Sequence, residues 1–303
     1  MAEEARPEAG LSVVVATTKP WPEVRVCLES FLGEARAIGA EVVVPDSNGC
    51  GLPADAEVRY PDVVRLTEHG ASIYRLRALG MARARGEVVA FLEDHCRAWP
   101  GWCAGHLSAH RDHPEVVGVG GRVENGARRR ISDWASFLVN HAGWMAPVES
   151  GHRTSADYAN VSFKRSRVVH EPSKDATEEA GRLRELRERG EPLFFDARIV
   201  ADHDQSLGLI ATLVLHFHAG RATAGLHVRA GLGPAARIRG VAGSLAVAPV
   251  FFVRTLMALH ARRTTRPKVL ASLPLEVVML CVGSAGLFSG YLAGPGASPW
   301  RIP

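Results

Sequence analysis

Acidic and imidazole side chains follow directly on an apolar stretch in VVAFLEDH, residues 88–95. The apolar residues predict a buried strand, and Glu93, Asp94 and His95 come one after another at its carboxyl end. Carboxylates and imidazoles bind divalent cations, and a bound cation in turn binds anions such as phosphates. The alternative is a cap for the helix predicted after Pro100, but that proline is too far along the chain for a cap. The pattern therefore favours a site for a metal-bound anionic ligand.

Other polar side chains also end predicted strands. The stretch LSVVVATT ends in Thr17 and Thr18, EVVVPDS reaches Asp46, and PLFFDARIVADHD leads to His203. Asp46 precedes Ser-Asn-Gly, which is also ordinary turn composition. Ligands of parallel sheets bind at the carboxyl ends of the strands, so we expect these side chains to meet in one cleft.

Strands and helices alternate over the first part of the chain, which predicts an α/β fold with a mostly parallel central sheet and flanking helices. The predicted strands are residues 11–18, 40–47, 63–66, 87–95, 116–123 and 192–204. The predicted helices are residues 23–39, 72–86, 101–114, 132–145 and 175–190, and residues 156–166 alternate and then turn.

The composition is that of a globular protein. The chain has 303 residues, of which 47% are hydrophobic and 22% charged. Its five cysteines are odd in number and scattered, which favours a reducing compartment over a disulfide framework. The acidic stretch MAEEARPEAG has no apolar core, so we expect residues 1–10 to be disordered and not a secretory signal. These features predict a cytoplasmic location.

Four residues could form a structural zinc site instead of packing against the sheet. Cys103, His106 and His110 share one face of the predicted helix, and Cys96 precedes it. The Cys-x6-Cys spacing is looser than in common zinc sites, and Trp102 on the same helix indicates packing. A small apolar face with cysteine inside is the favoured interpretation.

The last part of the chain is basic and apolar. Residues 216–303 contain ten Lys or Arg and one acid, Glu276. The stretch 272–294 is long enough to cross a bilayer, whereas 243–260 is shorter and contains Pro249 and Arg254. Two interfacial helices, or one span after a basic collar, are the favoured predictions, and a helical lid on a soluble domain is the alternative. Aromatic stacking motifs are missing, so we expect an anionic membrane surface and no nucleic acid as partner.

The order of these residues resembles the family 2 glycosyltransferases, which have the GT-A fold. The resemblance covers residues 11–215 and rests on five stretches taken together. These are LSVVVATTKPWPEVRVCLESF, EVVVPDS, YRLRALGMARARGEVVAFLEDH, YANVSFKRS, and TEEAGRLRELRERG followed by ARIVADH. It implies a glycosyltransferase domain at 11–215 and a membrane-associated helical tail at 216–303.

The resemblance also implies roles for single residues. Those that would bind the nucleotide-sugar donor are Thr17, Thr18, Asp46, Arg77, Glu93 and Asp94. Those that would manage the metal and the diphosphate are Asp94, His95 and His203. Asn160 would lie on the acceptor side, and Glu179 or its neighbour Glu178 would take the proton of the acceptor hydroxyl. Such a base implies transfer with inversion at the anomeric carbon, to a glycan, lipid-linked or small-molecule acceptor at the inner face of the cell membrane. The expected process is synthesis of a cell-surface glycan or glycolipid.

The chain departs from the family pattern at three places. Glu-Asp-His replaces Asp-x-Asp, Ala78 replaces the Asn of Arg-Asn-x-Gly, and Glu178-Glu179 replaces Glu-Asp. Imidazole suits Mn²⁺ or Zn²⁺ better than Mg²⁺, so two questions stay open: whether the expected divalent cation is Mn²⁺ or Mg²⁺, and whether a metal is needed at all. A protein that binds a nucleotide sugar without turnover is one alternative. A nucleotidyltransferase is another, although ATTKPWP lacks the glycines of that class's opening loop.

Overall fold

The computed structural model describes residues 10–21, 23–47, 55–168, 186, 189–264 and 266–302. The chain divides into two compact units. The first, here called the sheet unit, comprises residues 1–123 and 149–203, and the second, the helical unit, comprises 124–148 and 204–303. The predicted boundary between residues 215 and 216 falls inside a helix of the second unit and stays a prediction, as does disorder in 1–10, of which only Gly10 is described.

One mixed sheet of nine strands forms the centre of the sheet unit. Its strands are β1 (Leu11–Val14), β2 (Glu41–Asp46), β3 (Val63–Thr67), β4 (Val88–Leu92), β5 (Cys96–Ala98), β6 (Gly118–Asn125), β7 (Gly151–Arg153), β8 (Asn160–Lys164) and β9 (Leu193–His203). Their order is β3-β2-β1-β4-β8-β6-β9-β5, with β7 paired to β9. The predicted α/β class with a central sheet is confirmed, but the prediction that the sheet is mostly parallel is wrong, because more of its strand pairs are antiparallel than parallel.

The parallel part of the sheet comprises the four strands β3, β2, β1 and β4. Beyond β4 the sheet turns antiparallel, because β8 pairs with β4 and β6 in that sense and β9 pairs likewise with β5 and β7. The chain order reverses between β1 and β4, since β2 and β3 lie to one side of β1 and β4 to the other. Ligands of open α/β sheets bind at such a reversal, outside the carboxyl ends of the strands.

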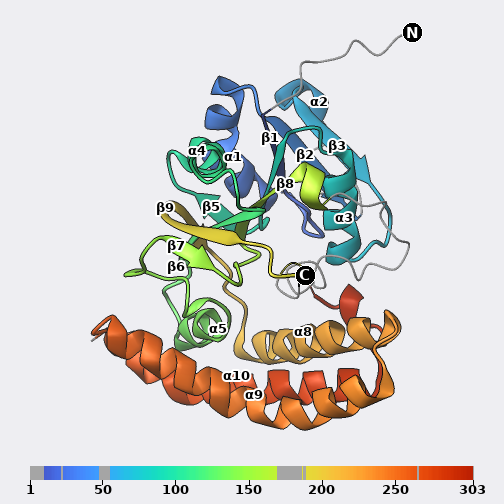
Figure 1. The fold of residues 1–303 in the computed structure, drawn as a ribbon, viewed down its shortest axis with the longest axis vertical. Helices are drawn as coiled ribbons and strands as arrows, with labels where there is room; N and C mark the ends of the chain where they lie inside the picture. The colour runs from blue at the N-terminus through green and yellow to red at the C-terminus, as the bar shows by residue number, and fades with distance from the viewer. Residues whose placement is uncertain are drawn as a thin grey trace. The chain divides into compact units, whose positions relative to one another are not determined.

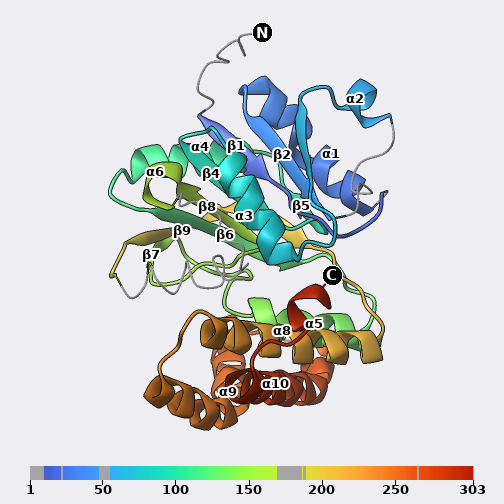
Figure 2. The ribbon, with the colours of Figure 1, turned by 90° about the vertical axis from the view of Figure 1, so that its right-hand side faces the viewer.

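Helices cover both faces of this sheet (Figures 1 and 2). Helices α1 (Glu23–Ala37) and α4 (Trp102–Asp112) lie on one face and α3 (Ile73–Arg83) on the other, with the short α2 (Ala56–Arg59) and α6 (Arg165–Val168) at the periphery. Gly80 lets α3 approach the sheet closely. A Cβ atom at Gly80 would lie 2.3 Å from Cγ1 of Val14 and 2.9 Å from Cγ of Pro45.

Buried β-branched and aromatic residues hold the sheet to its helices. Val14, Val43, Val89, Phe91 and Phe163 belong to one cluster in which no member is more than 8% exposed. Their burial on the central strands supplies the hydrophobic free energy that fixes the strand ends in place. The polar residues after these strands are therefore held on a rigid frame.

The helical unit contains α5 (Ile131–His141), α8 (Leu209–Arg229), α9 (Pro234–Ala261), α10 (Pro267–Ala293) and the 3₁₀ turn η1 (Ser298–Trp300). Helix α10 packs against α8, α9 and α5 (Figure 1). Its contact with α8 is close, since a Cβ at Gly286 would lie 2.1 Å from the carbonyl oxygen of Phe217. The two predicted apolar helices are confirmed and are longer than the stretches 243–260 and 272–294, whereas α8 was not predicted.

Two helices, α9 and α10, are long and apolar enough to cross a membrane by length and composition. Core helices of soluble proteins can pass the same test, but they are mostly buried. The apolar window of α10 is 39% buried inside the structure, whereas that of α9 is only 11% buried. Helix α9 therefore exposes apolar surface that the described chain does not cover.

Candidate metal and nucleotide site

Three side chains of the sheet unit direct one possible ligand atom each toward a common point. Nε2 of His95 lies 2.9 Å from Nε2 of His203, and each of these atoms lies 3.4 Å from Oε2 of Glu93. Two ligand atoms bound to one cation at about 2.1 Å lie about 3.0–3.4 Å apart at octahedral or tetrahedral angles. The spacing of the three atoms thus fits one divalent cation.

The sheet explains why residues so distant in sequence meet here. Strand β4 ends at Leu92, the chain turns, and the backbone amide of Cys96 donates to the carbonyl oxygen of Glu93 at 2.8 Å. Strand β5 then runs antiparallel to β9, with Cys96 opposite His203. That register brings the last residue of β9 beside the turn that carries Glu93 and His95.

Asp94 lies behind the imidazole of His95 instead of joining the three converging atoms. Its Oδ1 is 2.8 Å from Nδ1 of His95, and its Oδ2 accepts a hydrogen bond from the hydroxyl of Thr17 at 2.8 Å. Such a carboxylate–imidazole pair orients a metal-binding histidine and leaves Nε2 as the ligand atom. The sequence predicts Asp94 as a metal ligand and both Asp94 and Glu93 as nucleotide-sugar contacts, whereas in this geometry Glu93 supplies the converging oxygen and Asp94 supports His95.

Both carboxylates are held in the charged form. Burial alone would raise the pKa of Glu93, but the hydrogen bond with His203 and the nearby charges of His95 and Arg77 hold this pKa well below its usual value. Burial would likewise raise the pKa of Asp94, and the hydrogen bond with His95 together with the charge of Lys19 lowers it to about 2. Charged carboxylates are the form that binds a cation.

Two basic side chains lie beside these acids. Nη2 of Arg77, from α3, lies 3.0 Å from Oε1 of Glu93, so the predicted site residue does reach the cluster although Ala78 stands beside it. Nζ of Lys19 lies 3.0 Å from Oδ1 of Asp94 and 3.0 Å from Nδ1 of His95. Lys19 was not predicted, because it lies in the KPWP turn after β1, where no periodicity distinguishes it from other turn residues.

Thr17 connects the carboxyl ends of β1 and β2 to the cluster of Glu93, Asp94, His95 and His203. Thr17 forms an isolated parallel bridge with Asp46 and donates to Asp94, so the predicted residues of β1, β2 and β4 do lie together. The carboxylate of Asp46 is buried and accepts hydrogen bonds from Thr67 at 3.1 Å and Arg65 at 3.3 Å. Thr18 is half-buried beside them.

Asn160 lies inside the protein instead of facing the cleft. Its side chain is completely buried on β8, and its amide oxygen accepts from the indole of Trp102 at 2.8 Å and lies 3.2 Å from Nε2 of His106. Its amide nitrogen donates to the carbonyl oxygens of Arg122 and Ile199. We therefore interpret Asn160 as a residue that ties α4 to the sheet, not as a direct contact to an acceptor.

The predicted base, Glu179 or Glu178, lies outside the described residues, as does most of the helix predicted at 175–190. Both roles stay predictions.

The cysteines and histidines of α4 pack as the favoured interpretation expects. His106 and His110 contact the hydroxyl of Ser162 at 2.8 Å and 3.0 Å, and Cys96 and Cys103 are buried free thiols. Within the described ranges, these four residues are not among the groups whose side chains could share an ion. The other such group, His113, Glu115 and His152, lies at the surface, with its histidines 3.6 Å and 3.8 Å from the glutamate.

No protein-family model and no curated protein matches this chain. Among solved structures, 208 chains match. One of them is the crystal structure of GalNAc-T7 with UDP, GalNAc and Mn²⁺, which is 14% identical with a TM-score of 0.45. The match covers 65% of this chain and 43% of that one, so this chain spans less than half the length of the protein it matches.

Proposed function

We propose that the chain is a glycosyltransferase that moves a sugar from a nucleotide-sugar donor to a hydroxyl acceptor with inversion at the anomeric carbon. The observation that carries the proposal is the convergence of Glu93, His95 and His203 where the strand order reverses. A nucleotide sugar carries a diphosphate leaving group, and a cation site at the carboxyl ends of parallel strands is suited to that group. The resemblance of the sequence to the family 2 glycosyltransferases supports the same reading.

The donor set fits a divalent cation with affinity for imidazole. Two nitrogens and one carboxylate oxygen suit Mn²⁺ better than Mg²⁺, which prefers oxygen ligands. A bound cation would supply charge neutralisation to the diphosphate. Glu93, His95 and His203 would hold it, and Asp94 would keep the ring of His95 oriented.

The remaining residues of the site bind and orient the donor. Arg77 and Lys19 place positive charge beside the acids, where it attracts the diphosphate. Thr17 and Asp46 shape the tips of β1 and β2, where the nucleoside would bind, and we assign Asp46 the role of holding Arg65 and Thr67 in place. Glu179 or Glu178 would accept the proton of the acceptor hydroxyl, and direct displacement by that hydroxyl gives inversion.

The exposed face of α9 supports membrane association of the same protein. Its large apolar side chains include Leu245, Val253 and Met257, which are 73%, 52% and 66% exposed. Ten basic residues against one acid in residues 216–303 favour an anionic surface. We propose that the chain acts at the inner face of the cell membrane in the synthesis of a cell-surface glycan or glycolipid.

Metal-dependent nucleotide binding tests the donor site. Thermal unfolding of the full chain is followed with a panel of nucleoside diphosphates, each with and without Mn²⁺. One nucleotide should raise the melting temperature only when Mn²⁺ is present. H203A should abolish that increase, whereas H152A, which removes a histidine of the surface group, should keep it. Stabilisation that needs no metal and survives H203A would refute the proposal.

The base is tested separately by E178Q and E179Q. Replacing the true base should lower transfer by about 10²–10⁴-fold while nucleotide binding stays intact. Release of nucleoside diphosphate from the nucleotide sugar is the measurement. Unchanged transfer in both variants and in the double variant would remove these glutamates from the mechanism.

A further inference from the structure

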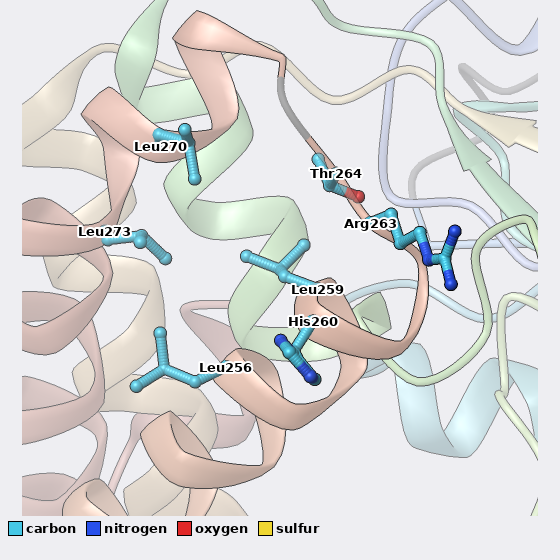
Figure 3. A pocket seen from close by; sticks show the side chains of 7 residues that line it. All are labelled: Leu256, Leu259, His260, Arg263, Thr264, Leu270 and Leu273. Atoms are coloured by element: carbon cyan, nitrogen blue, oxygen red, sulfur yellow. The ribbon is translucent and has the colours of Figure 1, made fainter.

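A cavity lies within the helical unit, between the end of α9 and the start of α10. It is open to solvent and has a volume of about 520 Å³, and the residues that line it are Leu256, Leu259, His260, Arg263, Thr264, Leu270 and Leu273 (Figure 3). Leucines from both helices form its walls, while Arg263 and Thr264 lie on the connecting turn at one side. No acid lines it. The cavity is therefore apolar inside and cationic at one edge.

Arg263 occupies a backbone position that usually belongs to glycine. Its φ of 47° lies in the left-handed region. Among the described residues, Arg263 is the one residue other than glycine with a positive φ. Its amide donates to the carbonyl oxygen of His260 at 2.9 Å, and that of Thr264 donates to Leu259 at 3.1 Å, which together form a Schellman cap. Glycine would satisfy the cap without strain. An arginine kept in a strained position suggests a use for its side chain.

Within the part of the chain that the structure describes, no acid pairs with the arginine at the edge of the cavity. Arg263 and His260 are exposed, and the side chain of neither has a hydrogen bond or ion pair with another described residue. The side chain of the neighbouring Arg262 is already hydrogen-bonded, because it donates to the carbonyl oxygens of Met145 and Gly143. The guanidinium of Arg263 is thus the cation available to an anion at this edge, and the imidazole of His260 lines the same cavity.

The cavity continues into the exposed apolar face of α9. Leu256 lines the cavity and is 40% exposed, and its neighbours Met257 and Val253 are 66% and 52% exposed. A ligand that fits both parts has an apolar chain and an anionic head. Phospholipids with a net negative charge have this chemistry, and an apolar helix face on a membrane would bring them to the cavity.

We propose that this cavity binds one anionic phospholipid, with an acyl chain between the leucines of α9 and α10 and the phosphate at Arg263 and His260. The inference extends the membrane association proposed above and does not depend on the sugar-transfer chemistry. Its occupant is a lipid of the membrane on which the protein acts, which locates this end of α9 at the headgroup level.

The test uses the full chain and vesicles of phosphatidylcholine, alone or in equimolar mixture with phosphatidylglycerol. Wild-type protein should bind the mixed vesicles several-fold more tightly. R263G should lower that binding about fivefold, the contribution of one basic residue near the surface. Glycine is favoured at this cap, so the melting temperature should not fall, and a loss of binding cannot be attributed to unfolding. R263K should restore most of the binding.

A matched control separates the cavity from diffuse charge. R239Q removes one exposed positive charge near the other end of α9 and should leave binding almost unchanged. Equal losses in R239Q and R263G would overturn the proposal, as would an Arg263-dependent melting shift with inorganic phosphate alone. Absence of vesicle binding together with a dimer in sedimentation would assign the apolar face to a second copy instead. Metal-dependent nucleotide binding should be unaffected in R263G, so failure of the lipid proposal is distinguishable from failure of the donor site.

Discussion

At the scale of single residues, the candidate site consists of three atoms that could bind a cation and of groups that orient them. Asp94 is the clearest orienting group, because its carboxylate contacts Nδ1 of His95, the hydroxyl of Thr17 and the ammonium of Lys19. It is 4% exposed, so these contacts take place away from water. Asp94 therefore controls which nitrogen of His95 is available to a cation.

Substituting Asp94 with Asn should weaken metal binding without removing a converging atom. Asparagine keeps the size of the side chain but loses the charge that stabilises the oriented imidazole, and such changes typically reduce metal affinity about 10–100-fold. Calorimetric titration with Mn²⁺ measures the effect. D112N, which neutralises an aspartate at the end of α4, should bind Mn²⁺ like the wild type. Equal affinities of D94N and the wild type would mean that Asp94 does not orient a ligand.

The sequence indicated which residue types would meet, but not which atom each would present. The apolar run VVAFL correctly predicted that Glu93, Asp94 and His95 follow a buried strand. It could not tell which of three consecutive turn residues faces the cleft, because the turn is irregular and has no side-chain period. The role of Asn160 could not be predicted from the sequence either. The partners of its four hydrogen bonds lie on α4, β6 and β9, which only tertiary packing brings together.

At the scale of elements, helix α3 connects the fold to the site. It carries Arg77 on the side toward Glu93, and Gly80, one turn further on, contacts the sheet. The distance from the backbone of α3 to Val14 and Pro45 leaves no space for a larger residue. The position of Arg77 therefore depends on a glycine that does not itself touch the site.

Substituting Gly80 with Ala should destabilise the sheet unit by about 1–3 kcal/mol, because an added methyl group would overlap Val14 and push α3 outward. The same shift should weaken nucleotide binding by moving Arg77. G33A is the matched control, since a Cβ there would meet nothing within 4 Å, and alanine favours helix α1. Urea unfolding measures both variants. A G80A protein as stable as G33A would show that α3 has room to move.

The parallel part of the sheet was predictable and the antiparallel part was not. Strands β1 to β4 are apolar β-branched runs separated by helices, a pattern that implies parallel pairing. Strand β5 has only three residues, and the pairing of β8 between β4 and β6 depends on contacts between distant segments. Helix α8 could not be predicted from the sequence, because it has no polar face. Apolar residues, histidines and glycines are mixed along it, in the order LIATLVLHFHAGRATAGLHVR.

At the scale of the whole molecule, the proposed donor site and the proposed membrane contact belong to different units. The sheet unit contains the acids, the imidazoles and the strand ends, whereas the helical unit contains the exposed apolar helix and most of the basic excess. Substitutions that affect nucleotide binding should therefore leave vesicle binding intact, and the reverse should hold as well. This independence makes each proposal testable without the other.

The free energy of unfolding should also depend on pH, because two neutral histidines are buried between α4 and the sheet. His106 is completely buried, and Ser162 connects it by hydrogen bonds to His110. Burial lowers the pKa of His106 to about 4 and that of His110 to about 3, the latter with help from the charges of His106 and Lys164. Both histidines are thus neutral in the folded protein at a pH where they are protonated in the unfolded chain.

The sign of the effect follows from these lowered values. Above the unfolded pKa of about 6.5 neither state is protonated and the stability is complete. Below it the unfolded chain takes up protons that the folded protein does not, so the free energy of unfolding falls as the pH drops toward 4. Each histidine contributes a slope of up to about 1.4 kcal/mol per pH unit.

Hydrogen exchange of the β8 amides between pH 7 and pH 5 reports this slope for the sheet unit. In H106Q the free energy of unfolding should change less steeply with pH, because one proton fewer is taken up on unfolding. H69Q removes an exposed histidine and should keep the wild-type slope. Equal slopes in H106Q and the wild type would show that His106 is protonated in the folded protein, in conflict with its burial against Asn160 and Ser162.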